Sequence, residues 1–171
     1  MEPYTSKTGV FADDRGLLFP LALEPEWIQS NISINKKWTF RGLHHQSGKY
    51  AQAKLISVVK GSIIDFLVDL RKNSFEETHF FRLQAGDQVY VPKGFAHGFL
   101  ALEEDTIIQY LVDSAYLPEK ERSFDWTSNQ TVRELILAEV GDKNNLLISV
   151  KDSSAIKIST DFSETIDYLS I

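Results

Sequence analysis

The segment RGLHHQ (residues 41–46) holds two adjacent histidines, His44 and His45, in a chain with only four histidines in all. Imidazole titrates near physiological pH, so a histidine that faces a cavity can serve as a general base. Adjacent side chains on an extended strand point to opposite faces. We therefore expect one of these histidines to face a site and the other to pack within the fold.

A second segment, GDQVYVPKGFAHGF (residues 86–99), places Gly86, Pro92, Gly94 and His97 at the spacing of the second motif of the cupin jelly rolls. In metal-binding cupins this histidine joins an HxH pair and a glutamate, since several N and O ligands must converge on the metal. His44 and its neighbour do not alternate in that way, and no glutamate follows them closely. We predict that the protein has no metal site.

A barrel with suitable strand phases would still turn an acid/base set inward. Its members are His44, Lys54, Asp65, His97 and Tyr110. Taken singly, each of these residues is more often structural than catalytic. The strand IIDFLVDLR changes that balance, because its two aspartates are costly to bury unless each is paired or hydrogen-bonded. We expect one of Asp65 and Asp69 to face a polar interior.

The elements that would position these residues are mostly short strands. Segments rich in β-branched and aromatic residues alternate with the turn signals KG, AGD, PKG and EED. The predicted strands are residues 53–59, 62–70, 78–83, 88–91, 99–102 and 106–112. Only Lys60 and Gly61 separate the first two, which predicts a tight hairpin. Helical periodicity is confined to residues 131–140, and a second short helix is expected after Asp152 as its N-cap.

Composition limits the class of protein. The 171 residues are enough for one domain spanning residues 1–171, and no run of 18 apolar residues is present. A net charge of -6 without a Lys/Arg block argues against nucleic acid or a membrane surface as partner. The absence of cysteine and of a leader-like start favours a cytoplasmic protein.

With these motifs assembled, the chain resembles the dTDP-4-dehydrorhamnose 3,5-epimerases, a family of metal-free cupins. The resemblance runs from Asp14-Arg15-Gly16 to about Asp152. The motifs that carry it are RGLHHQ (41–46), AQAKL (51–55), DFLVDLR (65–71), VPKGFAHGF (91–99), YLVDSAYLP (110–118) and ISVKD (148–152).

The resemblance implies a mostly β cupin jelly-roll barrel with a few short helices towards the C-terminus, and an isomerase that needs no cofactor. It makes His44 the general base, Asp152 the carboxylate that orients it, and Tyr110 the acid on the opposite face of the sugar. Lys54 would lie beside the ketone oxygen of the substrate. His45 takes a place that the family usually gives to phenylalanine, so it is expected to pack.

The implied ligand is a dTDP-linked 4-keto sugar. Arg15, Arg41, His97 and Lys151 would lie near its diphosphate, and Tyr116 against the nucleotide base. The other residues expected to bind substrate are Gln29, Asn31, Ser33, Gln46 and Asp65. The resemblance also implies a homodimer in which the N-terminal segment, residues 1–40, contributes to the interface.

Departures from the family pattern leave alternatives open. Leu17, Leu18 and Pro20 replace the aromatic and acidic residues that help to hold the nucleotide in family members. Another nucleotide is therefore an alternative. Inversion at C3 alone is a second one, because relatives with near-identical catalytic groups invert only that centre and the shape of the pocket decides. A non-catalytic cupin that binds a sugar nucleotide is a third, because the fold can occur without the activity. A metal-dependent cupin oxygenase or isomerase is a further one, disfavoured by the lack of ligands.

Overall fold

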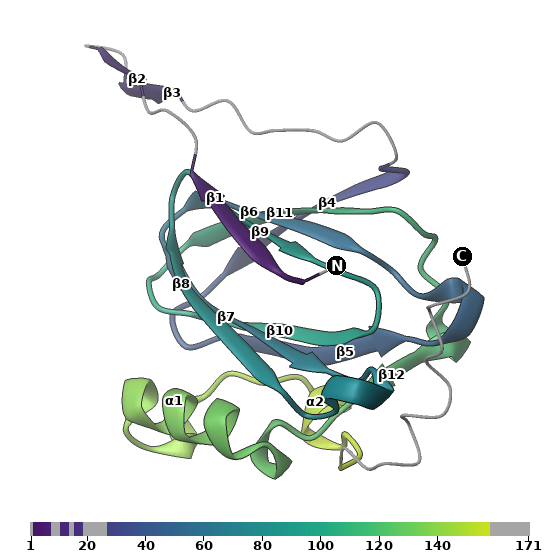
Figure 1. Ribbon diagram of the computed structural model, residues 1–171. Helices are drawn as coiled ribbons and strands as arrows, with labels where there is room; N and C mark the ends of the chain where they lie inside the picture. The colour runs from purple at the N-terminus through teal and green to yellow at the C-terminus, as the bar shows by residue number, and fades with distance from the viewer. Residues whose placement is uncertain (1, 8–10, 14–15, 19–26, 158–171) are drawn as a thin grey trace.

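The computed structural model describes residues 2–7, 11–13, 16–18 and 27–157. Ten of its strands form two facing antiparallel sheets, and β2 (Phe11–Asp13) pairs with β3 (Gly16–Leu18) in a separate two-stranded sheet (Figure 1). In spatial order the first sheet contains β1 (Tyr4–Lys7), β9 (Asp87–Val91), β6 (Lys54–Lys60), β11 (Thr106–Val112) and β4 (Gln29–Asn35). The second contains β12 (Glu121–Ser123), β5 (Phe40–Gln46), β10 (Phe95–Ala101), β7 (Ser62–Asp69) and β8 (Thr78–Gln84). The predicted jelly-roll fold is confirmed.

Strand β7 contributes side chains to the hydrophobic clusters on both faces of its sheet. Its residues after Ser62 are all buried, although only alternate side chains point between the sheets. Ile63 and Leu67 join the core between the sheets, whereas Phe66 and Val68 pack on the other side. A strand covered on both faces reads as a continuous apolar run, and this explains the segment SIIDFLVDL.

Helix α1 (Gln130–Val140) covers the outer face of the second sheet (Figure 1). Val132, Ile136 and Val140 are its buried residues. The Asn129 side chain accepts a hydrogen bond from the Val132 amide at the start of the helix, and Gly141 follows its end with φ of 71°. The predicted helix over residues 131–140 is therefore confirmed.

The prediction of a helix that begins after Asp152 is wrong. Helix α2 (Val150–Ser153) begins earlier. The Ser149 side chain is its N-cap, because it accepts a hydrogen bond from the Asp152 amide. Asp152 lies inside this turn, and its carboxylate makes a different contact, described below. The short 3-10 helices of the described chain are Gly48–Tyr50, Lys72–Ser74, Pro118–Lys120, Trp126–Ser128 and Lys143–Asn145. No helix in this part of the chain is long and apolar enough to cross a membrane.

The predicted hairpin at Lys60-Gly61 is also wrong. Strands β6 and β7 belong to different sheets, so Gly61 carries the chain from one layer to the other. Gly61 has φ of +81°, and a Cβ atom there would lie 2.4 Å from Thr106 Oγ1. Glycine is required at this crossing both by its backbone conformation and by the space available.

Replacing Gly61 with alanine should destabilise the fold more than replacing Gly48. Gly48 also has positive φ, +61°, but nothing lies within 4 Å of a Cβ atom built there. We expect Gly48→Ala to lower the free energy of unfolding by about 1–2 kcal/mol. Gly61→Ala should cost about 1–3 kcal/mol more, because the methyl group also meets Thr106. Urea unfolding measures both, and equal losses would contradict the steric part of this argument.

Candidate active site

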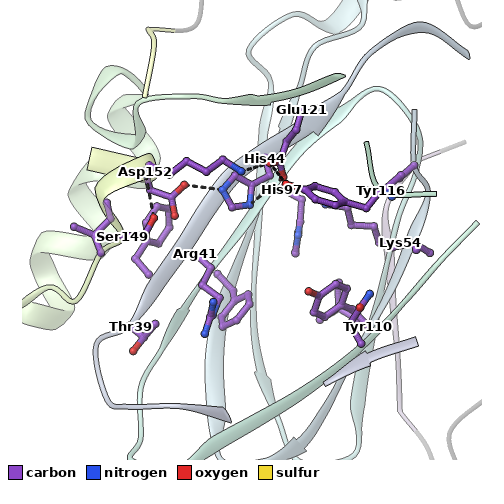
Figure 2. A pocket seen from close by; sticks show the side chains of 18 of the residues that line it. Thr39, Arg41, His44, Lys54, His97, Tyr110, Tyr116, Glu121, Ser149 and Asp152 are labelled. Carbon is purple, nitrogen blue, oxygen red and sulfur yellow. Dashed lines mark hydrogen bonds and ion pairs between the residues drawn. The ribbon is translucent and has the colours of Figure 1, made fainter. Parts of the chain in front are cut away.

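A cavity of about 620 Å³ lies between the two sheets, and Figure 2 shows side chains that line it. It takes residues from β4, β5, β6, β10 and β11 and from the segments that follow β11 and α1. The polar lining residues are Gln29, Asn31, Thr39, Arg41, His44, Gln52, Lys54, His97, Tyr110, Tyr116, Glu121, Ser149, Lys151 and Asp152. Its apolar lining includes Phe40, Ile56, Phe99, Val112, Leu147 and Ile148.

His44 and Asp152 form one of two histidine–carboxylate pairs. His44 Nε2 lies 2.6 Å from Asp152 Oδ1 (Figure 2). Burial disfavours the charged carboxylate, but His44, with hydrogen bonds from Ser149 and the Gly42 backbone, holds the pKa of Asp152 below its ordinary value. An ionised Asp152 makes Nε2 of His44 the protonated nitrogen. The lone pair of the neutral ring then lies on Nδ1.

The second pair joins His97 to Asp65. His97 lies directly opposite His44 on the neighbouring strand, and its Nε2 is 2.8 Å from Asp65 Oδ2. Asp65 is fully buried behind His97, and this burial raises its pKa although the charges of His97 and Lys54 oppose the shift. The expectation about a polar interior applies to Asp65, because Asp69 is engaged elsewhere by Arg71.

The opposite wall of the cavity carries Lys54 and Tyr110. Both residues lie in the first sheet, whereas His44 lies in the second. Tyr110 pairs with Ile56 across the two strands, so it and Lys54 point to the same side of the sheet. Burial lowers the pKa of Lys54 to about 8, against the charges of Glu121 and Asp65, which raise it. The ammonium of Lys54 is therefore easier to deprotonate than that of an ordinary lysine.

Glu121 links three other lining residues at the cavity mouth. Its carboxylate pairs with the Lys151 ammonium and accepts a hydrogen bond of 3.0 Å from the Tyr116 hydroxyl (Figure 2). Its Oε1 atom also lies 3.9 Å from His44 Nδ1. Glu121 thus brings Lys151, Tyr116 and His44 to one carboxylate.

Arg41 and a pair of amides lie along the same cavity. The Arg41 Nε atom donates to Asn35 Oδ1 at 2.8 Å, which fixes the plane of the guanidinium. Gln29 Nε2 donates to Asn31 Oδ1 at 2.8 Å. The two residues are two positions apart on β4, so their side chains lie on the same face of the strand. A planar cation beside amide donors suits an oxyanion such as a phosphate.

His45 is buried and does not belong to the cavity lining. Burial lowers its pKa to about 4, although a hydrogen bond to the Phe95 backbone opposes the shift. Its Nε2 atom is buried without a hydrogen-bond partner. His45 is therefore neutral at physiological pH and packs within the fold, whereas His44 faces the cavity.

Most of the residues predicted to act on substrate meet in this cavity. The exceptions within the described chain are Asp65, which contacts it through His97, and Ser33 and Gln46, which do not line it. Arg15 and Pro20 lie outside the described residues, and Leu17 and Leu18 belong to β3 (Gly16–Leu18). Among the residues that the structure describes, no group of three His, Asp or Glu side chains could hold a metal ion.

Sequence reasoning missed four polar lining residues: Thr39, Gln52, Glu121 and Ser149. Glu121 is the most consequential because of its contacts with Lys151 and Tyr116. It occurs in the charged run PEKER, which resembles a solvated turn. Ser149 had a usable signal, since Ser-x-x-Asp before a short helix is typical of a capping box.

The arrangement suits removal and return of a proton beside a carbonyl group. A neutral imidazole on one wall can accept the proton, and a phenol on the other wall can supply one. An ammonium placed in the same cavity can stabilise the negative charge that develops on a carbonyl oxygen.

Comparison with known proteins finds epimerases of similar sequence. The family model described as dTDP-4-dehydrorhamnose 3,5-epimerase matches residues 3–160. The chain is 35% identical to the epimerase of that name from Methanothermobacter thermautotrophicus over 157 residues, which cover 88% of this chain and 83% of the relative. Its Escherichia coli counterpart is also 35% identical over 157 residues, covering 84% of this chain and 82% of the relative.

Solved structures agree with the sequence comparisons. The epimerase from Elizabethkingia anophelis superimposes with a TM-score of 0.77 at 33% identity, covering 92% of this chain and 91% of that one. The Legionella pneumophila enzyme, solved in complex with dTDP-4-keto-L-rhamnose, gives a TM-score of 0.79 at 26% identity, covering 94% and 91%. On sequence and fold together, the chain belongs to the dTDP-4-dehydrorhamnose 3,5-epimerase family.

Proposed function

We propose that this protein epimerises a dTDP-linked 4-keto-6-deoxy sugar at C3 and C5, converting dTDP-4-dehydro-6-deoxy-D-glucose to dTDP-4-dehydro-L-rhamnose. The observation that carries the proposal is the imidazole of His44, oriented by Asp152, facing a cavity whose opposite wall holds Tyr110 and Lys54. A relative of the same fold is known in complex with dTDP-4-keto-L-rhamnose, the product expected here.

In this reaction the ketone at C4 acidifies the hydrogens at C3 and C5. His44 Nδ1 takes the C3 proton, and the electron pair of the broken C–H bond moves towards the C4 oxygen as an enolate. Lys54 stabilises that oxyanion, and Asp152 stabilises the imidazolium. Tyr110 then returns a proton to the opposite face of C3, which inverts the centre. His44 then releases its proton to solvent and Tyr110 regains one, after which the same steps at C5 complete the reaction, and no net oxidation or reduction occurs.

The nucleotide is assigned to the rest of the cavity. Arg41, His97 and Lys151 provide positive or hydrogen-bonding groups for a diphosphate, and the exposed ring of Tyr116 can stack on a base. Gln29 and Asn31 add amide groups suited to the nucleoside. Arg15 stays part of the proposed diphosphate site on the strength of the family resemblance.

We also propose a homodimer in which β4 and the segment 1–40 contribute to the interface. Ile32 and Ile34 on β4, with Ile28 just before it, have 69%, 66% and 63% of their side-chain surface exposed. Strand β4 lies at the edge of its sheet within the described chain, and a bare apolar edge favours association. The hairpin of β2 (Phe11–Asp13) and β3 stands apart from the two sheets in Figure 1, as expected for a segment that contacts a partner.

Proton exchange tests the proposed reaction directly. Incubation with dTDP-4-dehydro-6-deoxy-D-glucose in deuterated water should remove the proton NMR signals at both C3 and C5. His44→Ala should slow both exchanges by a factor of about 100 or more while dTDP still binds. Exchange at C3 alone would identify a C3 epimerase, and bound dTDP without any exchange would identify a binding protein. Loss of dTDP binding in His44→Ala would make His44 a structural residue.

The exchange rate should fall as the pH rises through about 8. Lys54 is protonated below this pKa and neutral above it, so the charge that stabilises the enolate disappears on the alkaline side. Glu121→Gln should move this alkaline limb of the pH–rate profile to lower pH, because the Glu121 charge raises the pKa of Lys54. Asp142→Asn, at an exposed turn, is the matched control and should leave the limb in place. If the alkaline limb is unchanged in Glu121→Gln, the fall in exchange rate does not arise from the titration of Lys54.

Sedimentation velocity tests the proposed dimer. Ile32→Asp places a charge on the exposed face of β4 and should shift the protein from dimer to monomer at micromolar concentration. Phe80→Asp is the control, because Phe80 is an exposed aromatic residue on β8 of the other sheet. A dimer that survives Ile32→Asp but not Phe80→Asp would move the interface to the second sheet.

A further inference from the structure

Gln46 ends strand β5, two residues after His44, and its side chain bonds backbone groups of two other segments. It is 4% exposed and does not line the cavity. The expectation that Gln46 contacts substrate therefore has no support in its position. Its environment suggests another contribution to the same site.

The amide of Gln46 makes three hydrogen bonds to backbone groups. Its Nε2 donates to the carbonyl of Tyr50 at 2.9 Å and to that of Ala115 at 3.1 Å. Its Oε1 accepts from the amide of Leu117 at 2.7 Å. Both amide hydrogens are thus used, and two of the three partners lie immediately before and after Tyr116.

The segment that carries Tyr116 is anchored at Asp113, which accepts a hydrogen bond from the Ala53 amide and pairs with Lys93. Residues 113–117 lie between β11 and the turn Pro118–Lys120, outside both sheets. Backbone groups without a ladder partner must be satisfied by side chains or by water. Gln46 supplies that support on both sides of Tyr116, and Gln52 Nε2 adds a bond of 2.7 Å to the Ser114 carbonyl.

Tyr116 depends on this support because its own ring is poorly enclosed. It is 48% exposed, and the polar contact of its hydroxyl is with Glu121 Oε2 (Figure 2). Glu121 in turn lies opposite Gln46 in the pairing of β12 with β5. Gln46 therefore adjoins both the backbone of Tyr116 and the strand position of the carboxylate that holds the Tyr116 hydroxyl.

We propose that Gln46 is a positioning residue that fixes Tyr116 at the cavity wall and thereby sets the affinity for the nucleotide. This inference rests on the proposed function, because it assigns the nucleotide end of the cavity to Tyr116. A purely structural Gln46 would affect stability alone. A positioning Gln46 would raise the apparent Kd of the nucleotide by reducing the fraction of molecules with Tyr116 in place.

The test compares dTDP binding and turnover in two substitutions. Gln46→Leu removes all three hydrogen bonds, and Gln46→Glu keeps the acceptor for Leu117 while losing both donors. Calorimetry should show Kd for dTDP raised about tenfold in Gln46→Leu, as expected if Tyr116 is in place about a tenth of the time. KM should rise in parallel, whereas kcat should change less than about threefold, because bound substrate selects the ordered segment.

A double-mutant cycle identifies the route of the effect. If Gln46 acts through Tyr116, Gln46→Leu should weaken dTDP binding no further in a Tyr116→Ala background. Gln88→Leu is the control for loss of a buried amide, since Gln88 is 1% exposed and bonds Ser57 in the first sheet. That control should leave Kd for dTDP unchanged.

Several outcomes would overturn the proposal. They are additive effects of the Gln46 and Tyr116 substitutions, an equal effect of Gln88→Leu, or a fall in kcat with unchanged KM. If Gln46→Leu does not fold, Gln46→Glu carries the same comparison, and wild-type affinity in that variant would also overturn the proposal. Wild-type protein that binds dTDP but exchanges no proton would refute the proposed reaction alone, whereas failure to bind dTDP would refute both.

Discussion

The hydrogen bond between His44 and Asp152 is the contact on which the organisation of the site depends. It joins two residues 108 positions apart, one in the second sheet and one in the short helix α2. The bond assigns the tautomer of His44, and the Ser149 cap holds the turn from which Asp152 approaches. Without α2 against β5, His44 would be an ordinary strand histidine. Helix α2 is therefore part of the site, although it adds no strand to either sheet.

The two histidine–carboxylate pairs look alike but have different electrostatic settings. Asp152 has several donors, so its charge is stabilised and its pKa is lowered. Asp65 is enclosed more completely, and its pKa is raised. The imidazole on β5 therefore lies beside a carboxylate whose pKa is lowered, and the imidazole on β10 lies beside one whose pKa is raised. This difference supports the proposed roles of His44 as the base and His97 as a binding residue.

Local sequence patterns predicted six of the strands and α1, because β-branched runs and turn residues act over short distances. They did not predict β4 or β5, and the jelly-roll class came from the family resemblance. They failed at Lys60-Gly61, since two strands joined by a short turn can pair or separate into different sheets. The space at Gly61 is limited by Thr106, which is remote in sequence. Glu121 was missed for a similar reason: its partners Lys151 and Tyr116 converge only in the folded chain.

The residue-by-residue resemblance located most of the cavity lining, but it could not distinguish contact with substrate from support of a neighbour. Gln46 illustrates the limit, because a buried amide that holds a loop and a cavity amide that holds a ligand have the same sequence signature. The structure separates them by the partners of the side chain, which for Gln46 are backbone groups.

The proposed base His44 and the proposed acid Tyr110 lie in different sheets, so the packing between those sheets influences how far apart they are. Residues of the inner core such as Ile56 and Phe99 also line the cavity, and their volumes contribute to that packing. Packing between the sheets thus affects the distance over which a proton would be transferred. Changes in the size of these apolar side chains would alter the distance between the proposed base and acid without replacing either group.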